Sequence, residues 1–150
     1  MRVTHDLDTT ALAHLLAQLS GDLVLVLDAQ GGVLRVAAGA DTVLPAGASD
    51  WEGQPWSETV APDSRAKVDR MLRELTQGGR TRRRELNHPQ PGGGFAAYAY
   101  HAQQLSPGGL ALAMGRDLRT QSALQQRLLQ ALREVESRAY SSSPETSLMP

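Results

Sequence analysis

The segment GRDLRTQSALQQRLLQALREVES, residues 115–137, is the stretch that decides how this chain is interpreted. It follows an apolar strand predicted at residues 110–114 with almost no loop, and its spacing of leucines predicts a long helix. The helix carries no cluster of residues suited to catalysis, but it has an apolar stripe suited to pairing with another helix. A strand that runs directly into such a helix is typical of a sensory or dimerising domain rather than of an enzyme.

The composition of the 150 residues narrows the class of protein further. The formal net charge is −1, which argues against non-specific binding to nucleic acid or to an anionic membrane. There is no cysteine, so disulfides, thiolate metal sites and thiol nucleophiles are excluded. No apolar run reaches the roughly 18 residues of a membrane span, and the N-terminus MRVTHDLDTT lacks an apolar signal core. We therefore expect a cytoplasmic protein of one domain.

The rest of the chain predicts an alternation of helices and hairpins. Residues 1–20 are expected to form an N-terminal amphipathic helix, capped near Asp8, with a loose start before that residue. Glycine, proline and polar clusters separate the later elements. We expect strands at 23–27 and 33–36, short helical turns around Trp51 and Trp56, a helix at 62–77, strands at 81–88, 95–105 and 110–114, a linker helix at 118–138 and a disordered tail at 139–150.

This element order predicts an α+β fold with a five-stranded antiparallel sheet, flanked by an N-terminal helix and a long C-terminal helix. Two strands, a helical excursion and three more strands form the order of a PAS domain. We assign that domain to residues 21–117.

Several short stretches resemble the PpsR/CrtJ transcriptional regulators of photosynthetic bacteria, in particular their N-terminal PAS-like region and the Gln-rich linker that follows it. The resemblance covers most of the chain from about residue 21 to residue 136. The matching pieces occur in the family's order: WEGQPWSETV (51–60), PDSRAKVDRML (62–72), ELNHP (85–89), GRDLR (115–119) and LQQRLLQA (124–131).

The resemblance implies a cytoplasmic, dimeric regulator of photosynthesis genes. In that family the region contributes to oligomerisation and to contact with an antirepressor, a photoreceptor or another regulator, whereas a helix-turn-helix at the far C-terminus binds DNA. The present sequence contains neither further PAS domains nor that helix-turn-helix. We therefore expect a homodimeric, non-enzymatic interaction module that does not bind DNA directly.

Two leucine stripes are the candidate dimer and output contacts. In the linker helix, Leu118, Gln125 and Leu132 occupy one heptad position, and Gln121, Leu128 and Val135 occupy the other. Asp117 is placed to cap this helix, and a related Asp starts the output helix in many PAS domains. The alternative is that the helix packs back on its own sheet. The N-terminal stripe, which covers either its own sheet or a partner, consists of Leu12, Leu15, Leu16 and Leu19.

The remaining candidates favour structural roles. Arg80, Arg82, Arg83 and Arg84 form the single basic run, but strand alternation would split it between two faces, and neighbouring acids are expected to balance it. His88 and His101 lie on neighbouring predicted strands and invite a metal or acid–base hypothesis, although no ligand spacing supports it.

No cofactor is expected. A flavin photoreceptor of the LOV type needs a cysteine, and the main predicted helix lacks the histidine that haem-binding PAS domains usually supply. We expect Leu, Val and Met side chains to fill the PAS pocket. The alternative function is a small-molecule sensor with a pocket behind Trp51 and Trp56.

Overall fold

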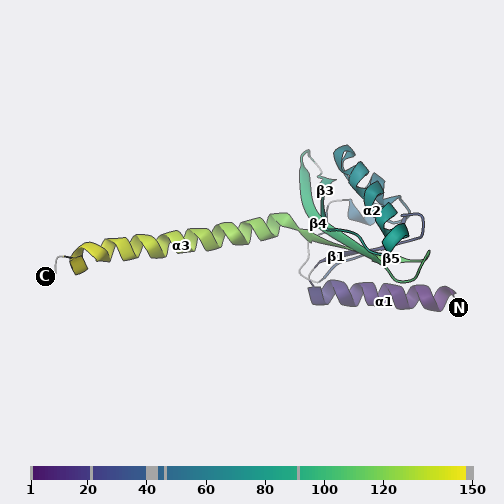
Figure 1. The fold of residues 1–150 in the computed structure, drawn as a ribbon, viewed down its shortest axis with the longest axis horizontal. Helices are drawn as coiled ribbons and strands as arrows, with labels where there is room; N and C mark the ends of the chain where they lie inside the picture. The colour runs from purple at the N-terminus through teal and green to yellow at the C-terminus, as the bar shows by residue number, and fades with distance from the viewer. Residues whose placement is uncertain (1, 21, 40–43, 46, 91, 148–150) are drawn as a thin grey trace. The chain divides into compact units, whose positions relative to one another are not determined.

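The computed structural model describes residues 2–20, 22–39, 44–45, 47–90 and 92–147. Within these residues the order of elements matches the predicted order (Figure 1). The elements are α1 (Arg2–Ser20), β1 (Leu23–Leu27), β2 (Val33–Ala37), the short 3₁₀ helices η1 (Ala48–Trp51), η2 (Trp56–Glu58) and η3 (Pro62–Ser64), α2 (Arg65–Gly78), β3 (Arg84–Pro89), β4 (Phe95–Gln104), β5 (Ala111–Asp117) and α3 (Leu118–Ser147).

The described strands form one five-stranded sheet in the order β2-β1-β5-β4-β3. Every neighbouring pair is antiparallel. The last strand, β5, therefore lies in the middle of the sheet between β1 and β4. The predicted α+β fold with an antiparallel sheet is confirmed.

Strand β1 explains why the sheet is covered on both faces. All five residues of its LVLVL sequence are buried. Successive side chains of a strand point to opposite faces, so the three leucines join one apolar cluster and the two valines join another. Figure 1 shows α2 on one side of the sheet and α1 on the other. We call the face toward α2 the inner face and the face toward α1 the outer face.

Helix α2 covers the inner face through a narrow apolar stripe. Val68, Met71 and Leu75 are buried, at the i, i+3, i+7 spacing of one helix face. Gly79 ends the helix in the left-handed conformation with φ of 79°, and its N–H donates to the carbonyl of Leu75 at 3.0 Å. The predicted helix at residues 62–77 thus corresponds to the 3₁₀ turn η3 followed by α2.

Several element boundaries differ from the sequence prediction. Helix α1 begins at Arg2, not near Asp8, because no proline or glycine interrupts the helical sequence that precedes the expected cap. Strand β3 begins at Arg84 rather than at residue 81, since the backbone N–H of Arg82 turns to a side chain, the carboxylate of Glu74, at 3.2 Å.

Helix α3 continues to Ser147, through most of the segment expected to be a disordered tail. No glycine follows Gly115 in the sequence, so the usual signal for a helix C-terminus is missing there. Residues 148–150 of that segment lie outside the described residues.

By its internal contacts the chain divides into two units, residues 1–118 and residues 119–150. The first unit holds the sheet with α1 and α2, and the second holds α3 after its first residue. Among the described residues, no helix has both the length and the apolar character needed to cross a membrane.

Candidate functional site

Helix α1 contacts its own sheet through small side chains rather than through its leucine stripe. Ala13 and Ala17 are completely buried against valines of β1 and Leu112 of β5, and Leu16 packs beside them. The other three leucines of the predicted stripe, Leu12, Leu15 and Leu19, are 40%, 52% and 77% exposed. Their spacing places them together on the opposite side of the helix from the alanines. The structure thus separates Leu16 from the rest of the predicted set.

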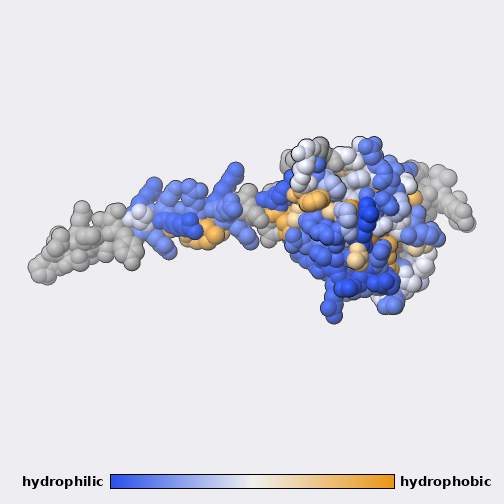
Figure 2. All heavy atoms as spheres, turned by 90° about the horizontal axis from the view of Figure 1, so that it is seen from above, coloured by the Kyte–Doolittle hydropathy of each residue, from blue (hydrophilic) through white to orange (hydrophobic). Residues whose placement is uncertain are grey.

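Helix α3 carries a broad apolar stripe of its own. Leu128, Leu132 and Val135 of the predicted heptad positions are each more than half exposed. Leu124 is exposed beside them, and at 100° per residue these four side chains fall within about a quarter of the helix circumference. Figure 2 shows an apolar spot on this helix among hydrophilic residues. Leu118 is half-buried at the start of the helix, and the side chain of Gln121 is not among those described.

Asp117 stands at the junction between the sheet and this helix. It is the last residue of β5, and Leu118 is the first of α3, so no loop separates the two elements. The hydroxyl of Tyr98 on β4 donates to Asp117 Oδ2 at 3.4 Å. The predicted output residue is therefore linked to a side chain that reaches into the inner layer of the domain.

That inner layer is organised around His88, whose side chain is completely buried. Its Nδ1 lies 2.7 Å from the backbone oxygen of Thr59, and its Nε2 lies 2.7 Å from the hydroxyl of Tyr100. A carbonyl oxygen only accepts, so Nδ1 carries the proton of the neutral ring and Nε2 accepts from Tyr100. Both ring nitrogens are thus satisfied within the described structure.

Burial shapes the acid–base properties of both groups. Burial lowers the pKa of His88 from 6.5 to about 4, opposed by its hydrogen bond to Thr59. Burial also raises the pKa of Tyr100 well above its usual value, with a smaller contribution from Tyr98. At neutral pH the pair is therefore an uncharged hydrogen-bonded unit.

Aromatic rings surround this unit on the inner face. Trp51 stacks on the His88 ring with centroids 4.3 Å apart, and Tyr98 meets it edge-on at 5.3 Å. Trp56 packs edge-on against Tyr100 at 5.7 Å. Gly115 lies opposite Tyr100 in the sheet, where a Cβ atom would come within 2.5 Å of the Tyr100 ring. A glycine at this position therefore leaves the space that the Tyr100 ring occupies beside β5.

The Leu, Val and Met side chains expected in the core do belong to the inner-face cluster. Aromatic rings that were not expected join them there: two indoles, two phenols and the His88 imidazole. The signal that was missed is the spacing of Tyr98 and Tyr100, which places both rings on one face of the same strand, the face that His88 meets from the neighbouring strand.

The proposed pairing of His88 with His101 is wrong. His101 follows Tyr100 directly in β4, so its side chain points to the outer face, where it is exposed opposite Met114. Among the described residues, no group of three or more His, Asp or Glu side chains is arranged to hold a metal ion. The histidine pair therefore supplies neither a metal site nor an acid–base pair.

The basic run has a partly different arrangement from the one expected. Arg84 forms a bidentate ion pair with Glu74 of α2, with Nη2 2.8 Å from Oε2 and Nη1 also bonded to Oε1. That hydrogen bond lowers the pKa of Glu74 to about 2. Only Arg84 of the run is balanced in this way, because no described acid lies within ion-pair distance of Arg80, Arg82 or Arg83.

Comparison with known proteins agrees with this architecture. The family model described as the PAS fold matches residues 18–123. No curated protein sequence matches the chain.

Three solved structures are similar to the chain at low sequence identity. The PAS domain of an HTR-like protein from Haloarcula marismortui is 21% identical, with a TM-score of 0.50, over 77% of this chain and 97% of that one. A domain of a sensory box sensor histidine kinase/response regulator from Geobacter sulfurreducens is 18% identical, with a TM-score of 0.55, over 73% and 94%. The RpfR quorum-sensing receptor PAS domain from Cronobacter turicensis, solved in complex with BDSF, is 13% identical, with a TM-score of 0.51, over 65% and 93%.

These solved structures share the fold, and the family match spans more than two thirds of the chain, including the whole sheet, α2 and the start of α3. The chain belongs to the PAS fold family.

Proposed function

We propose that this PAS signalling module acts without catalysis, as a homodimer that communicates with a protein partner, in the manner of the N-terminal part of a PpsR/CrtJ-type regulator. The observation that carries the proposal is the pair of exposed apolar stripes, one on α1 and one on α3. Each stripe holds leucines that the chain itself leaves more than one third exposed. Burial of such leucines against a second copy would remove that apolar surface from water, which is the usual driving force of association.

The supporting geometry links the sheet to both helices. Arg116 of β5 pairs with Asp22 at 3.2 Å, and Asp22 directly precedes β1, just after the end of α1. One residue further along β5, Asp117 receives the hydrogen bond from Tyr98. A shift of β5 would therefore alter the contacts of the α1–β1 connection and of the first residue before α3. This is the route by which we expect a partner at one helix to influence the other.

The oligomeric state of the full chain tests this proposal. Sedimentation equilibrium at tens of micromolar should show a dimer. Leu128→Asp should raise the dimer dissociation constant by at least about a hundredfold, since burial of one leucine side chain contributes about 1.5–3 kcal/mol and both copies lose it. Gln126→Asp introduces the same charge on the opposite face of α3 and should leave the constant unchanged. On α1, Leu15→Asp should likewise raise the dimer dissociation constant. The control His14→Asp, at the neighbouring position, should leave it unchanged.

A monomer at these concentrations, together with no effect of Leu128→Asp, would overturn the proposal. A dimer that responds to Leu15→Asp but not to Leu128→Asp would assign the contact to α1 alone. Equal effects of Leu128→Asp and Gln126→Asp would show a general loss of helix stability and would contradict an α3 interface.

A second candidate function is a small-molecule sensor, which one observation favours. Trp56 is completely buried, and its indole Nε1 has no hydrogen-bond partner among the described residues. A buried donor without an acceptor is costly, and a ligand that supplies an acceptor would satisfy it. Native mass spectrometry of the purified full chain tests this candidate. A co-purifying small molecule that is lost in Trp56→Phe supports it, and the bare polypeptide mass in both proteins counts against it.

A further inference from the structure

Positive charge is concentrated in one short part of this nearly neutral chain. Residues 65–84 hold eight of the fifteen Lys and Arg residues but only two of the sixteen Asp and Glu residues. Their net charge is therefore +6, while the rest of the chain carries −7. The segment comprises α2 and the connection to β3, so the structure gathers these charges on two adjacent elements.

Few of these charges are neutralised within the molecule. Glu74 is engaged by the bidentate pair with Arg84, and Arg82 also lowers the pKa of the Glu74 carboxyl. Within residues 65–84, all of which the structure describes, the guanidinium groups of five exposed arginines have no ion pair within 4.0 Å. We call these five the arginine surface: Arg70, Arg73, Arg80, Arg82 and Arg83.

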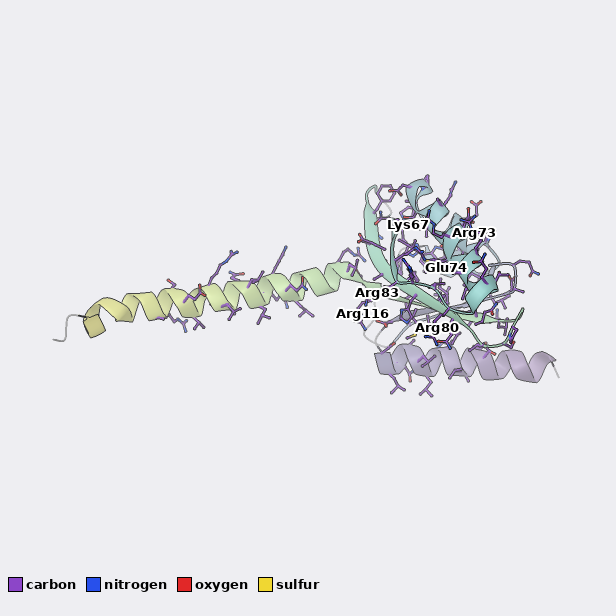
Figure 3. The ribbon with its side chains drawn as sticks, in the orientation of Figure 1. Lys67, Arg73, Glu74, Arg80, Arg83 and Arg116 are labelled. Atoms are coloured by element: carbon purple, nitrogen blue, oxygen red, sulfur yellow. The ribbon has the colours of Figure 1, made fainter. Side chains whose placement is uncertain are left out.

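The geometry relates members of the arginine surface to the end of α2. Arg70 and Arg73 are three residues apart on α2 and lie on the same side as Gln77, away from the buried stripe. An open concavity of about 410 Å³ is lined by Glu74, Gln77, Arg80 and Arg82. It joins the end of α2 to the connection that follows. Figure 3 labels Arg73 and Glu74 on α2 and Arg80 and Arg83 on the connection to β3.

The neighbouring strand edge is partly occupied in this region. Strand β3 is at the edge of the sheet, and three of its outward backbone groups already have partners. The carbonyl of Glu85 accepts from Lys67 Nζ at 3.0 Å, and the carbonyl of Asn87 accepts from Ala61 N at 2.7 Å. The Asn87 N–H donates to Ser64 Oγ at 3.0 Å. Contact with a partner would therefore be made by side chains and not by adding a strand to the sheet.

We propose that the arginine surface docks an acidic segment of a protein partner, a loop or helix with clustered Asp and Glu side chains. The inference rests on the proposed function as a protein-interaction module and assigns the chemistry of its partner. Arginine forks pair bidentately with carboxylates, as Arg84 already does with Glu74. Two features favour a protein over a nucleic acid: the whole chain is slightly negative, and no aromatic residue occurs in residues 65–84 on which a base could stack.

The test uses the full chain and a short fluorescein-labelled peptide that alternates Glu and Ser, with a Gln-for-Glu peptide as its control. Fluorescence anisotropy should detect binding of the Glu peptide alone, and the affinity should fall as salt is added, because the Debye length shortens from about 10 Å at 0.1 M to about 3 Å at 1 M. The variant R80Q/R82Q/R83Q should bind about tenfold more weakly or worse, as expected for the loss of three charged contacts. The matched control R35Q/R127Q/R133Q removes the same charge elsewhere and should bind as the parent chain does.

Three results would overturn the proposal: equal affinity of the R80Q/R82Q/R83Q variant and the parent, equal loss in the two triple variants, or tighter binding of an oligonucleotide of the same charge than of the Glu peptide. Sedimentation of the same variants separates this inference from the proposed function. A monomeric chain that still binds the Glu peptide through the arginine surface would remove the homodimer and keep the docking surface. A dimer whose Glu-peptide affinity is unaffected by R80Q/R82Q/R83Q would keep the homodimer and remove the docking surface.

Discussion

Acidification should destabilise this domain between pH 7 and pH 5 through a single buried imidazole. The pKa of His88 is about 4 in the folded chain and takes its ordinary value of 6.5 when the chain unfolds. In the window between these values the unfolded chain binds more protons than the folded chain. Stability therefore rises with pH through the window, is fully present above pH 6.5 and is lost as the pH falls toward 4.

The magnitude follows from the difference between the two pKa values. The slope is about 1.4 kcal/mol per pH unit in the middle of the window, so the free energy of unfolding should decrease by about 2 kcal/mol between pH 7 and pH 5. Most of the pH dependence of the Glu74 ion pair lies lower, since the pKa of that carboxyl shifts from 4.5 to about 2. The chosen range therefore isolates the histidine.

Urea unfolding followed by tryptophan fluorescence is the appropriate assay, because Trp51 stacks on His88 and Trp56 contacts Tyr100. Between pH 7 and pH 5 the free energy of unfolding of the parent chain should fall by about 2 kcal/mol, and that of His88→Gln should fall much less. The control His101→Gln alters an exposed histidine on the outer face and should behave as the parent does.

A His88→Gln variant that keeps the parent's full pH dependence would refute the reasoning. If that variant does not fold, an NMR titration of the parent decides the question. The His88 ring should remain neutral at pH 5 in the folded protein, and a midpoint near 6.5 would contradict the pKa shift on which the prediction rests.

Two further substitutions probe the same inner layer. Gly115→Ala would place a Cβ atom within 2.5 Å of the Tyr100 ring and should destabilise the domain by about 1–3 kcal/mol in thermal unfolding. In the control Gly78→Ala the added Cβ meets no atom within 4 Å, so the stability should stay close to that of the parent chain. Tyr100→Phe leaves the buried Nε2 of His88 without its donor and should cost about 1–3 kcal/mol in urea unfolding; an unchanged midpoint would mean that this hydrogen bond contributes nothing net.

Local patterns predicted the elements of this fold well. The apolar LVLVL run, the Asp28-Ala-Gln-Gly-Gly32 turn and the stripe of α2 each carry a direct signal of periodicity or turn chemistry. The direct passage from β5 into α3 was likewise visible in the sequence. These features depend on residues close together in the chain, which a single sequence displays.

The interior could not be predicted in the same way, because it depends on which strands become neighbours and on which faces meet. His88 and Tyr100 are brought together by the register of β3 on β4, which pairs Arg84 with Tyr100 and His88 with Ala96. The sequence alone does not show that register. Alternation along β4 separates Tyr100 from His101, but only the register of β3 on β4 determines that His88 shares a face with Tyr100 and not with His101.

The exposed apolar stripes are only partly predictable from the sequence. The leucine spacing in α1 predicts an apolar stripe, but the residues that meet the sheet are the alanines between the leucines. Large apolar side chains dominate a hydrophobicity pattern. A helix that packs close to a sheet, however, needs small side chains at the contact.

The doubly buried strand β1 also has a consequence for how the chain reaches its fold. In a strand with one solvent-exposed face, a slip of one residue in the pairing would move the apolar side chains from the core into water. The free-energy cost of that exposure favours the correct pairing. Strand β1 has leucine on one side and valine on the other, so a slip would exchange one apolar residue for another and meet little penalty from water. We therefore expect aspartates at its two ends to help set its alignment.

At one end Asp28 Oδ1 accepts from the N–H groups of Gln30 and Gly32 and closes the turn into β2. At the other end Asp22 holds Arg116 of β5. We infer that these two carboxylates limit slippage of a strand that has apolar side chains on both of its faces.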